Sequence, residues 1–163
     1  MSNEILKALL AQEQELQFRQ FNNDTAWLLG DSLKQAAERI PAAVTIEVYA
    51  FEQVIFSFSM ARTTKDNQDW ARRKRQSVMR FGHSSYYLGR YNAAKKRDFE
   101  MQAHLDASEY AAHGGSFPIR IKNCGLIGAV TVSGLPQVED HNLVVEAIKY
   151  LVEAQYAQSA SKI

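Results

Sequence analysis

Two glycine-containing loops carry the residues of this sequence that are best suited to binding chemistry. The first is His113-Gly114-Gly115-Ser116, in which the glycines let the backbone approach a ligand closely and leave N–H groups free to point at an anion. The imidazole of His113 is able to ligate a metal or carry a proton. The alternative is that the glycines only permit a sharp turn and that His113 hydrogen-bonds a backbone carbonyl.

The second loop is Ser133-Gly134-Leu135-Pro136, which leads into a predicted helix with Glu139, Asp140 and His141 in its first turns. Such a helix start presents unpaired N–H groups and the positive end of the helix dipole, so it favours an anion. The alternative is that the two carboxylates stabilise the helix start without any ligand. Asp140 and His141 are neighbours in a helix and do not face each other, which argues against a catalytic dyad.

A predicted β-hairpin connects the two loops. Its first strand is indicated by the alternation of Phe117, Ile119 and Ile121, its turn by Asn123-Cys124-Gly125, and its second strand by residues 126–133. The strands run away from the first loop and back to the second. We therefore expect both loops at one edge of the sheet, where their N–H groups would surround one carboxylate or phosphate.

A basic run, Arg72-Arg73-Lys74-Arg75, lies in a predicted helix that begins near Asp66-Asn67 and ends at Gly82. Residues 60–100 carry eleven basic and four acidic residues, a local charge of +7 that leaves −6 for the remainder of this +1 chain. Arg73, Lys74 and Arg80 are our candidates for contacts to an anionic ligand. Consecutive helical residues point all round the helix, so we favour ion pairing over nucleic-acid binding and expect no nucleic-acid partner.

Helical and strand periodicities alternate along the rest of the chain. They predict helices over residues 3–14 and 24–39, a hairpin over 44–60, short helical pieces at 86–88 and 99–101, and a final helix after Pro136. A short strand is expected at Leu16 to Phe18. Two hairpins separated by helices indicate the α+β class, with an antiparallel sheet covered on at least one face.

Composition sets the broad class. The chain has 163 residues, of which 46% are hydrophobic and 23% charged, so we expect one domain over residues 1–163. Its one cysteine, Cys124, permits no internal disulfide, and its four histidines show no zinc-binding spacing, so no metal site is expected. The sequence shows neither a secretory leader nor a membrane-length apolar run, which predicts a cytoplasmic protein with no membrane partner.

Four motifs, in this order, carry a family resemblance. They are Asp66-Asn67-x-x-Trp70 with Arg73-Lys74, then Phe81 to Tyr86, Tyr110 to Ile119, and Val132 to Val145 with its Ser-Gly-Leu-Pro-Gln segment. Together they resemble the uncharacterised cytosolic branch of the HbpS-like, haem-degrading domain family. The resemblance implies a profilin-like fold with a five-stranded antiparallel sheet flanked by helices, and assembly into a homo-oligomer.

The resemblance implies less about activity. It leaves the cofactor unknown but admits haem. For the iron ligand His113 is our first choice and His83 the second, and the haem propionates would lie at the two glycine loops. We therefore expect a cytoplasmic homo-oligomer that binds a small anionic ligand or a protein partner, with no established catalysis. The alternative is a haem-binding, haem-degrading or other redox-linked enzyme. The expected ligand-binding residues are His113, Gly114, Gly115, Ser116, Ser133, Gly134, Arg73, Lys74, Arg80, Asp140 and His141.

Overall fold

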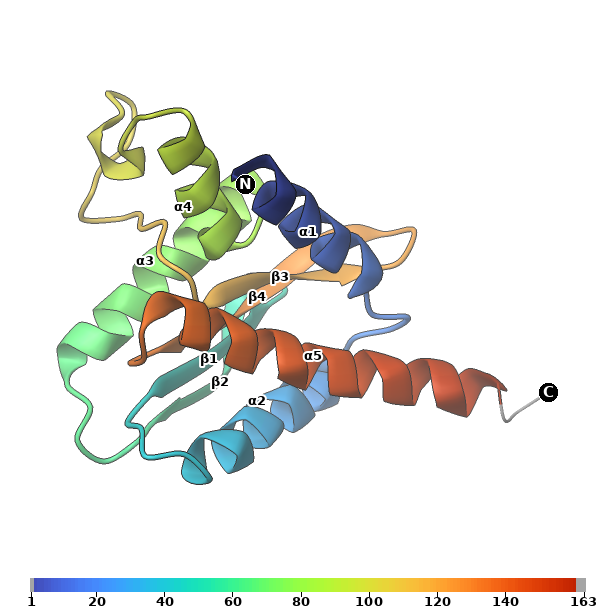
Figure 1. Ribbon diagram of the computed structural model, residues 1–163. Coiled ribbons are helices and arrows are strands. Elements are labelled where there is room, and N and C mark those ends of the chain that lie inside the picture. The colour runs from blue at the N-terminus through green and yellow to red at the C-terminus, as the bar shows by residue number, and fades with distance from the viewer. Residues whose placement is uncertain (1, 161–163) are drawn as a thin grey trace.

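A computed structural model describes residues 2–160 of the chain as a sheet with helices on both faces (Figure 1). In chain order the elements are α1 (Ser2–Glu15), α2 (Asn23–Glu38), β1 (Thr45–Ala50), β2 (Gln53–Ser59), α3 (Lys65–Phe81), α4 (Ser85–Ala94), the 3-10 turn η1 (Phe99–Met101), β3 (Ser116–Ile121), β4 (Gly125–Ser133) and α5 (Gln137–Ala160). The α+β class predicted from the sequence is confirmed. Of the helices in this range, none is long and apolar enough to cross a membrane.

The sheet has four strands in the order β2-β1-β4-β3, and all neighbouring pairs are antiparallel. The expected five-stranded sheet is therefore wrong. The segment predicted as a short strand forms a single parallel bridge, between Phe18 and Ile121. Phe18 accepts from Lys122 N–H and donates to the Arg120 carbonyl, and the chain then turns so that Asn22 can cap α2. The segment at Leu16 to Phe18 therefore forms one bridge and does not continue as a paired strand.

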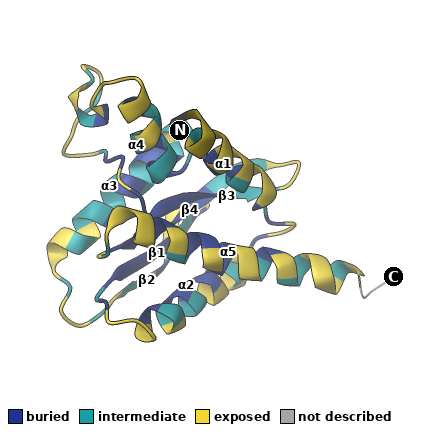
Figure 2. Ribbon diagram, in the orientation of Figure 1, coloured by how far each residue is buried: buried dark blue, intermediate teal, exposed yellow. Residues whose placement is uncertain are grey.

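The two faces of the sheet differ in chemistry. Ile46, Val48 and Val130 are fully buried in the apolar core that the sheet forms with α2 and α5 (Figure 2). Side chains alternate between faces along a strand. Glu47, which lies between Ile46 and Val48, instead pairs with Arg75 of α3 on the other face. Helix α3 thus covers a polar sheet surface, and this is how charged side chains come to be buried.

Helix α3 begins and ends with strong local signals. The Asn67 side chain accepts from the Thr64 N–H at 2.9 Å, which satisfies a backbone donor at the helix start. Gly82 ends the helix at φ 76°, a left-handed conformation that glycine adopts without strain, as the sequence predicted. Between these ends, Asn67, Trp70 and Lys74 follow at helical spacing and share one face of α3.

The outer edge of β3 is largely covered. At one end the Ser116 N–H donates to Ser85 Oγ at 3.0 Å, and at the other Phe18 bonds the Arg120 carbonyl and the Lys122 N–H. Between them lies Pro118, which has no N–H to offer. In the described residues no strand covers the outer edge of β2, at the opposite side of the sheet.

Candidate functional site

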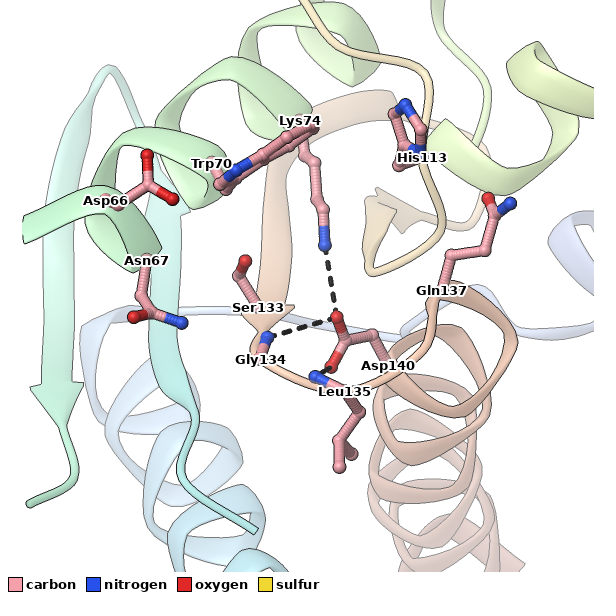
Figure 3. Close-up of a pocket in the computed structure, with 10 residues that line it drawn as sticks. All are labelled: Asp66, Asn67, Trp70, Lys74, His113, Ser133, Gly134, Leu135, Gln137 and Asp140. Carbon is pink, nitrogen blue, oxygen red and sulfur yellow. Dashed lines mark hydrogen bonds and ion pairs between the residues drawn. The ribbon is translucent and has the colours of Figure 1, made fainter. Parts of the chain in front are cut away.

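A cavity of about 320 Å³ opens where α3, the segment before β3 and the start of α5 meet (Figure 3). Its lining combines carboxylates, amides, an amine, an imidazole and an indole. The lining residues are Asp66, Asn67, Trp70, Lys74, His113, Ser133, Gly134, Leu135, Gln137 and Asp140. A volume near the lower end of the range for ligand pockets suits a small, polar molecule.

The two glycine loops meet at this cavity, as the hairpin argument predicted. The Val132 N–H donates to the Gly115 carbonyl at 2.8 Å, and the Gly114 N–H donates to Gln137 Oε1 at 3.0 Å. These bonds join the segment before β3 to the end of β4 and to the first residue of α5. Helix α3, which carries the predicted ligand-contact residue Lys74, supplies the third wall.

A buried ion pair lies at the floor of the cavity. Lys74 Nζ is 3.2 Å from Asp140 Oδ2, and the two side chains are 4% and 1% exposed. Nζ also donates to the Val132 carbonyl at 3.2 Å. An ammonium has three N–H donors, and these are its two acceptors in the described part of the chain. One donor therefore remains for a ligand.

Burial shifts both members of this pair towards their neutral forms. Removal from water lowers the pKa of Lys74, an effect that the Asp140 charge opposes. Burial likewise raises the pKa of Asp140, against the opposing effects of Lys74 and of two backbone N–H groups. The proton affinities of the amine and the carboxylate are thereby brought closer together, which eases proton transfer between them.

Asp140 also occupies the donors that the sequence suggested for an anion. Its carboxylate accepts from the Gly134 N–H at 3.2 Å and from the Leu135 N–H at 3.0 Å (Figure 3). Asp140 therefore binds backbone N–H groups of the loop that leads into its own helix. An added ligand would therefore meet Lys74 before these two N–H groups.

Gly115 makes room for the amine. A Cβ atom at this position would overlap the Val132 carbonyl oxygen and would lie 2.7 Å from Lys74 Nζ and 3.1 Å from Asp140 Cβ, and the residue has φ +137°. Both the space and the backbone conformation exclude other residues without rearrangement. The glycine is thus needed for the close approach of the Val132 backbone as well as for that of Lys74, whether or not its N–H contacts a ligand.

Aromatic and charged groups form the rim of the cavity. The rings of Trp70 and His113 meet edge to face at 5.1 Å, and the Arg73 guanidinium lies 4.4 Å from the centre of the Trp70 ring. His113 Nε2 is 3.6 Å from Glu100 Oε1, and its side chain is 47% exposed. Arg73 therefore supports the indole from outside the cavity lining.

Six predicted site residues do not line the cavity, namely Arg73, Arg80, Gly114, Gly115, Ser116 and His141. Arg80 lies over the rings of Phe81 and Tyr110, because it belongs to the last turn of α3. Ser116 is buried, with its Oγ 2.8 Å from Thr131 Oγ1. His141 faces away from Asp140, as expected for adjacent helical residues, and its Nε2 lies 2.8 Å from Gln12 Oε1 of α1.

Five lining residues were absent from the predicted site, namely Asp66, Asn67, Trp70, Leu135 and Gln137. The sequence held a signal for two of them, because Asn67 and Trp70 precede Lys74 by seven and four residues and so share its helix face. Gln137 carries no comparable signal. In the described residues no group of three or more His, Cys, Asp or Glu side chains is arranged to hold a metal ion.

The basic run is paired within the molecule, as the sequence interpretation favoured. Arg72 pairs with Asp69 and Glu109, both at 2.8 Å, and Arg75 Nε lies 2.6 Å from Glu47 Oε1. Burial raises the pKa of Glu47 although Arg75 opposes that shift. With Lys74 held by Asp140, three members of the run have carboxylate partners.

Comparison with protein families and known proteins gives consistent matches. The family model described as haem degrading protein HbpS-like matches residues 21–149. A UPF0303 protein of Psychromonas ingrahamii is 60% identical over 149 residues, which cover 91% of this chain and 94% of the relative.

Two solved structures have similar folds. The Ybr137w protein superposes with a TM-score of 0.84 at 28% identity, covering 91% of this chain and 88% of that one. A complex of PduOC with haem superposes with a TM-score of 0.66 at 15% identity, covering 81% of this chain and 94% of that one. At 15% identity the second match shows similarity of fold only.

Proposed function

The chain belongs to the HbpS-like family of haem degrading proteins, and from the geometry of its cavity we propose that it binds a small ligand there. The ligand carries an oxygen acceptor, with a carboxylate as the simplest case, that takes the remaining N–H of Lys74. One observation carries this proposal: a buried ammonium with a donor to spare lines an open polar cavity.

The other lining groups support a small polar ligand. Asn67, Ser133 and Gln137 offer amide and hydroxyl groups, and Trp70 offers an aromatic surface. Asp140 already neutralises Lys74, and Asp66 adds a second carboxylate to the lining, so the cavity does not concentrate positive charge. A single anionic group that reaches Lys74 is therefore favoured over a polyanion.

Titration with sodium acetate, followed through the indole N–H resonance of Trp70, tests this function. A saturable shift is expected in the wild type and in Lys65→Met, which removes an exposed lysine of the same helix. The shift should disappear in the double variant Lys74→Met with Asp140→Asn, which removes the pair without stranding a buried charge. An equal shift in the double variant would contradict the proposal.

Haem is the second ligand class, and the family description favours it. Haem iron needs an axial side chain, and a ligand pocket is mostly apolar. His113 is the imidazole of this lining, but its Nε2 faces Glu100, and most of the remaining lining is polar. These residues do not fit a macrocycle inside the cavity. A shifted Soret band that His113→Ala weakens would overturn this conclusion.

We propose in addition that the chain is a homo-oligomer. Trp27 and Leu28 of α2 are 59% and 56% exposed, and the outer edge of β2 is uncovered in the described residues. The predicted N-terminal stripe adds less, because Leu9 is buried while Ile5 and Leu10 are 37% and 39% exposed. Light scattering at micromolar concentration should give a mass well above the 18.4 kDa of one chain, and 18.4 kDa itself would exclude assembly.

A further inference from the structure

We propose that Lys74 is a reactive amine that forms an imine with a small aldehyde or ketone bound in the cavity. The inference rests on the proposed small-ligand function and names the class of ligand. Lys74 Nζ reaches the cavity floor from α3 and is held there by the Val132 carbonyl and by Asp140 (Figure 3).

A contribution to the stability of the fold does not explain why the Lys74–Asp140 pair is buried. A buried ion pair stabilises a fold weakly, because desolvation of the two charges offsets most of their attraction. A buried amine that lines an open cavity beside a proton acceptor is, by contrast, the arrangement that nucleophilic amines require.

The proton inventory of the step balances. Asp140 Oδ2, 3.2 Å from Nζ, takes a proton from the ammonium, and the neutral amine adds to the carbonyl carbon. The carbonyl π electrons move to oxygen, which takes the proton that the newly bonded nitrogen loses, and the resulting carbinolamine loses water with a proton returned from Asp140. Overall, one ammonium and one carbonyl compound give one protonated imine and one water, with no oxidant or reductant.

The surroundings of Nζ favour the neutral amine. Burial lowers the pKa of Lys74, while the negative charge of Asp140 opposes the shift. Three titratable groups face the amine or share its cavity, namely Asp66 on α3, His113 before β3 and Asp140 on α5. Of these, Asp140 is the one within hydrogen-bond distance of Nζ.

Reductive trapping of the full-length folded chain tests the proposal. Propionaldehyde and cyanoborohydride at neutral pH should alkylate Lys74 at least tenfold faster than the exposed Lys65 and Lys95, as measured by peptide mass spectrometry over time. Lys74 is 4% exposed, so a lysine with a purely structural role would react more slowly than these two. Slower alkylation of Lys74 overturns the proposal.

The pH dependence of trapping adds a readout independent of exposure. The alkylation rate at Lys74 should rise with pH and reach its plateau below the ordinary lysine pKa. Asp140→Asn should move the midpoint of this rise to lower pH, because it removes the negative charge that opposes the lowering of the Lys74 pKa. Lys65→Met serves as the matched control and should leave the Lys74 profile unchanged. A Lys74 profile that matches that of the exposed lysines overturns the proposal.

Acetate separates this inference from the proposed function, because it binds like a carboxylate ligand but cannot form an imine. Protection of a fast-reacting Lys74 by acetate, with no effect on Lys65, supports both. If acetate shifts the Trp70 signal while Lys74 is trapped slowly, imine chemistry is overturned and ligand binding stands. If Lys74 is trapped fast but acetate neither protects it nor shifts Trp70, the imine proposal is supported and carboxylate binding is overturned.

Discussion

His141 is a buried histidine whose surroundings favour the uncharged ring. It is 2% exposed, packs against the rings of Tyr86 and Phe117, and has one hydrogen-bond partner, Gln12 Oε1. Its Nδ1 is buried without a partner among the described residues. The arrangement matches the neutral tautomer with the proton on Nε2.

This environment predicts a pH-dependent stability. Burial lowers the pKa of His141 from 6.5 to about 4, so the unfolded chain binds a proton between these values that the folded chain does not. The free energy of unfolding should fall as the pH drops from 6.5 to 4, with His141 contributing about 3 kcal/mol. Denaturant unfolding across this range should show a flatter dependence in His141→Gln. The same substitution at the exposed His104 should leave the slope unchanged.

Gly115 offers a second test at the residue scale, because Gly125 provides a matched control. Both have positive φ, +137° and +114°, but nothing lies within 4 Å of a Cβ at Gly125. Gly125→Ala should therefore cost only backbone strain, about 1–3 kcal/mol. Gly115→Ala should cost about 2 kcal/mol more, because its Cβ meets the Val132 carbonyl and the ion pair. Equal losses in chemical denaturation would show that the Val132 backbone and Lys74 both move aside freely.

At the scale of elements, α1 depends on polar contacts to the rest of the molecule. Glu13 is buried, and its carboxylate accepts from the Ser84 N–H at 2.8 Å and contacts His83 Nδ1 at 3.0 Å. Through Ser84, this carboxylate ties α1 to the start of α4. Gln12, one residue earlier, contacts His141 of α5.

Removal of the Glu13 carboxylate should loosen α1. Glu13→Ala leaves the Ser84 N–H without its partner, which should cost about 1–3 kcal/mol. Hydrogen exchange of the α1 amides should accelerate, while exchange in β1 and β4 changes less. Glu15→Ala, which truncates an exposed carboxylate of the same helix, should behave like the wild type. Unchanged exchange in Glu13→Ala would show that apolar contacts such as that of Leu9 hold the helix.

The elements were more predictable from the sequence than the cavity. Alternation at Val44 to Val48 and at Phe117 to Ile121 identified strands, because apolar residues recur every two positions in a strand with one apolar face. The same rule failed at Leu16 to Phe18, where both apolar residues are buried but the chain turns away after one bridge. The alternation of apolar residues indicates which side chains are buried, but it does not indicate which strand the segment pairs with.

The cavity was only partly predictable, for a related reason. The hairpin register brought His113 and Ser133 together because two strands and a turn determine it. Lys74 was predicted but could not be distinguished from Arg73 and Arg80, since the sequence does not determine which of these basic residues lies on the side of α3 that meets the cavity. That side depends on the polar sheet face formed by Glu47 and its neighbours, a tertiary feature.

At the scale of the whole molecule, the basic run Arg72-Arg73-Lys74-Arg75 is largely satisfied by internal contacts. Arg72, Lys74 and Arg75 pair with carboxylates, and Arg73 stacks on Trp70. We therefore expect no binding to duplex or single-stranded DNA at physiological ionic strength. Fluorescence anisotropy of labelled DNA should stay flat between about 50 and 200 mM salt, whereas binding through phosphate contacts would weaken steeply over that range.

The covered edge of β3 sets a limit on how copies of this chain can join through their sheets. Growth of a continuous sheet needs two free edges on every copy, one for each neighbour. Here the bonds of Ser85 and Phe18, together with Pro118, leave few free backbone groups on the edge of β3. Pairing of one β2 with another would use up the free edges of both copies and give a two-fold unit of eight strands. Assembly by this route ends at two copies, which protects the chain against fibre formation.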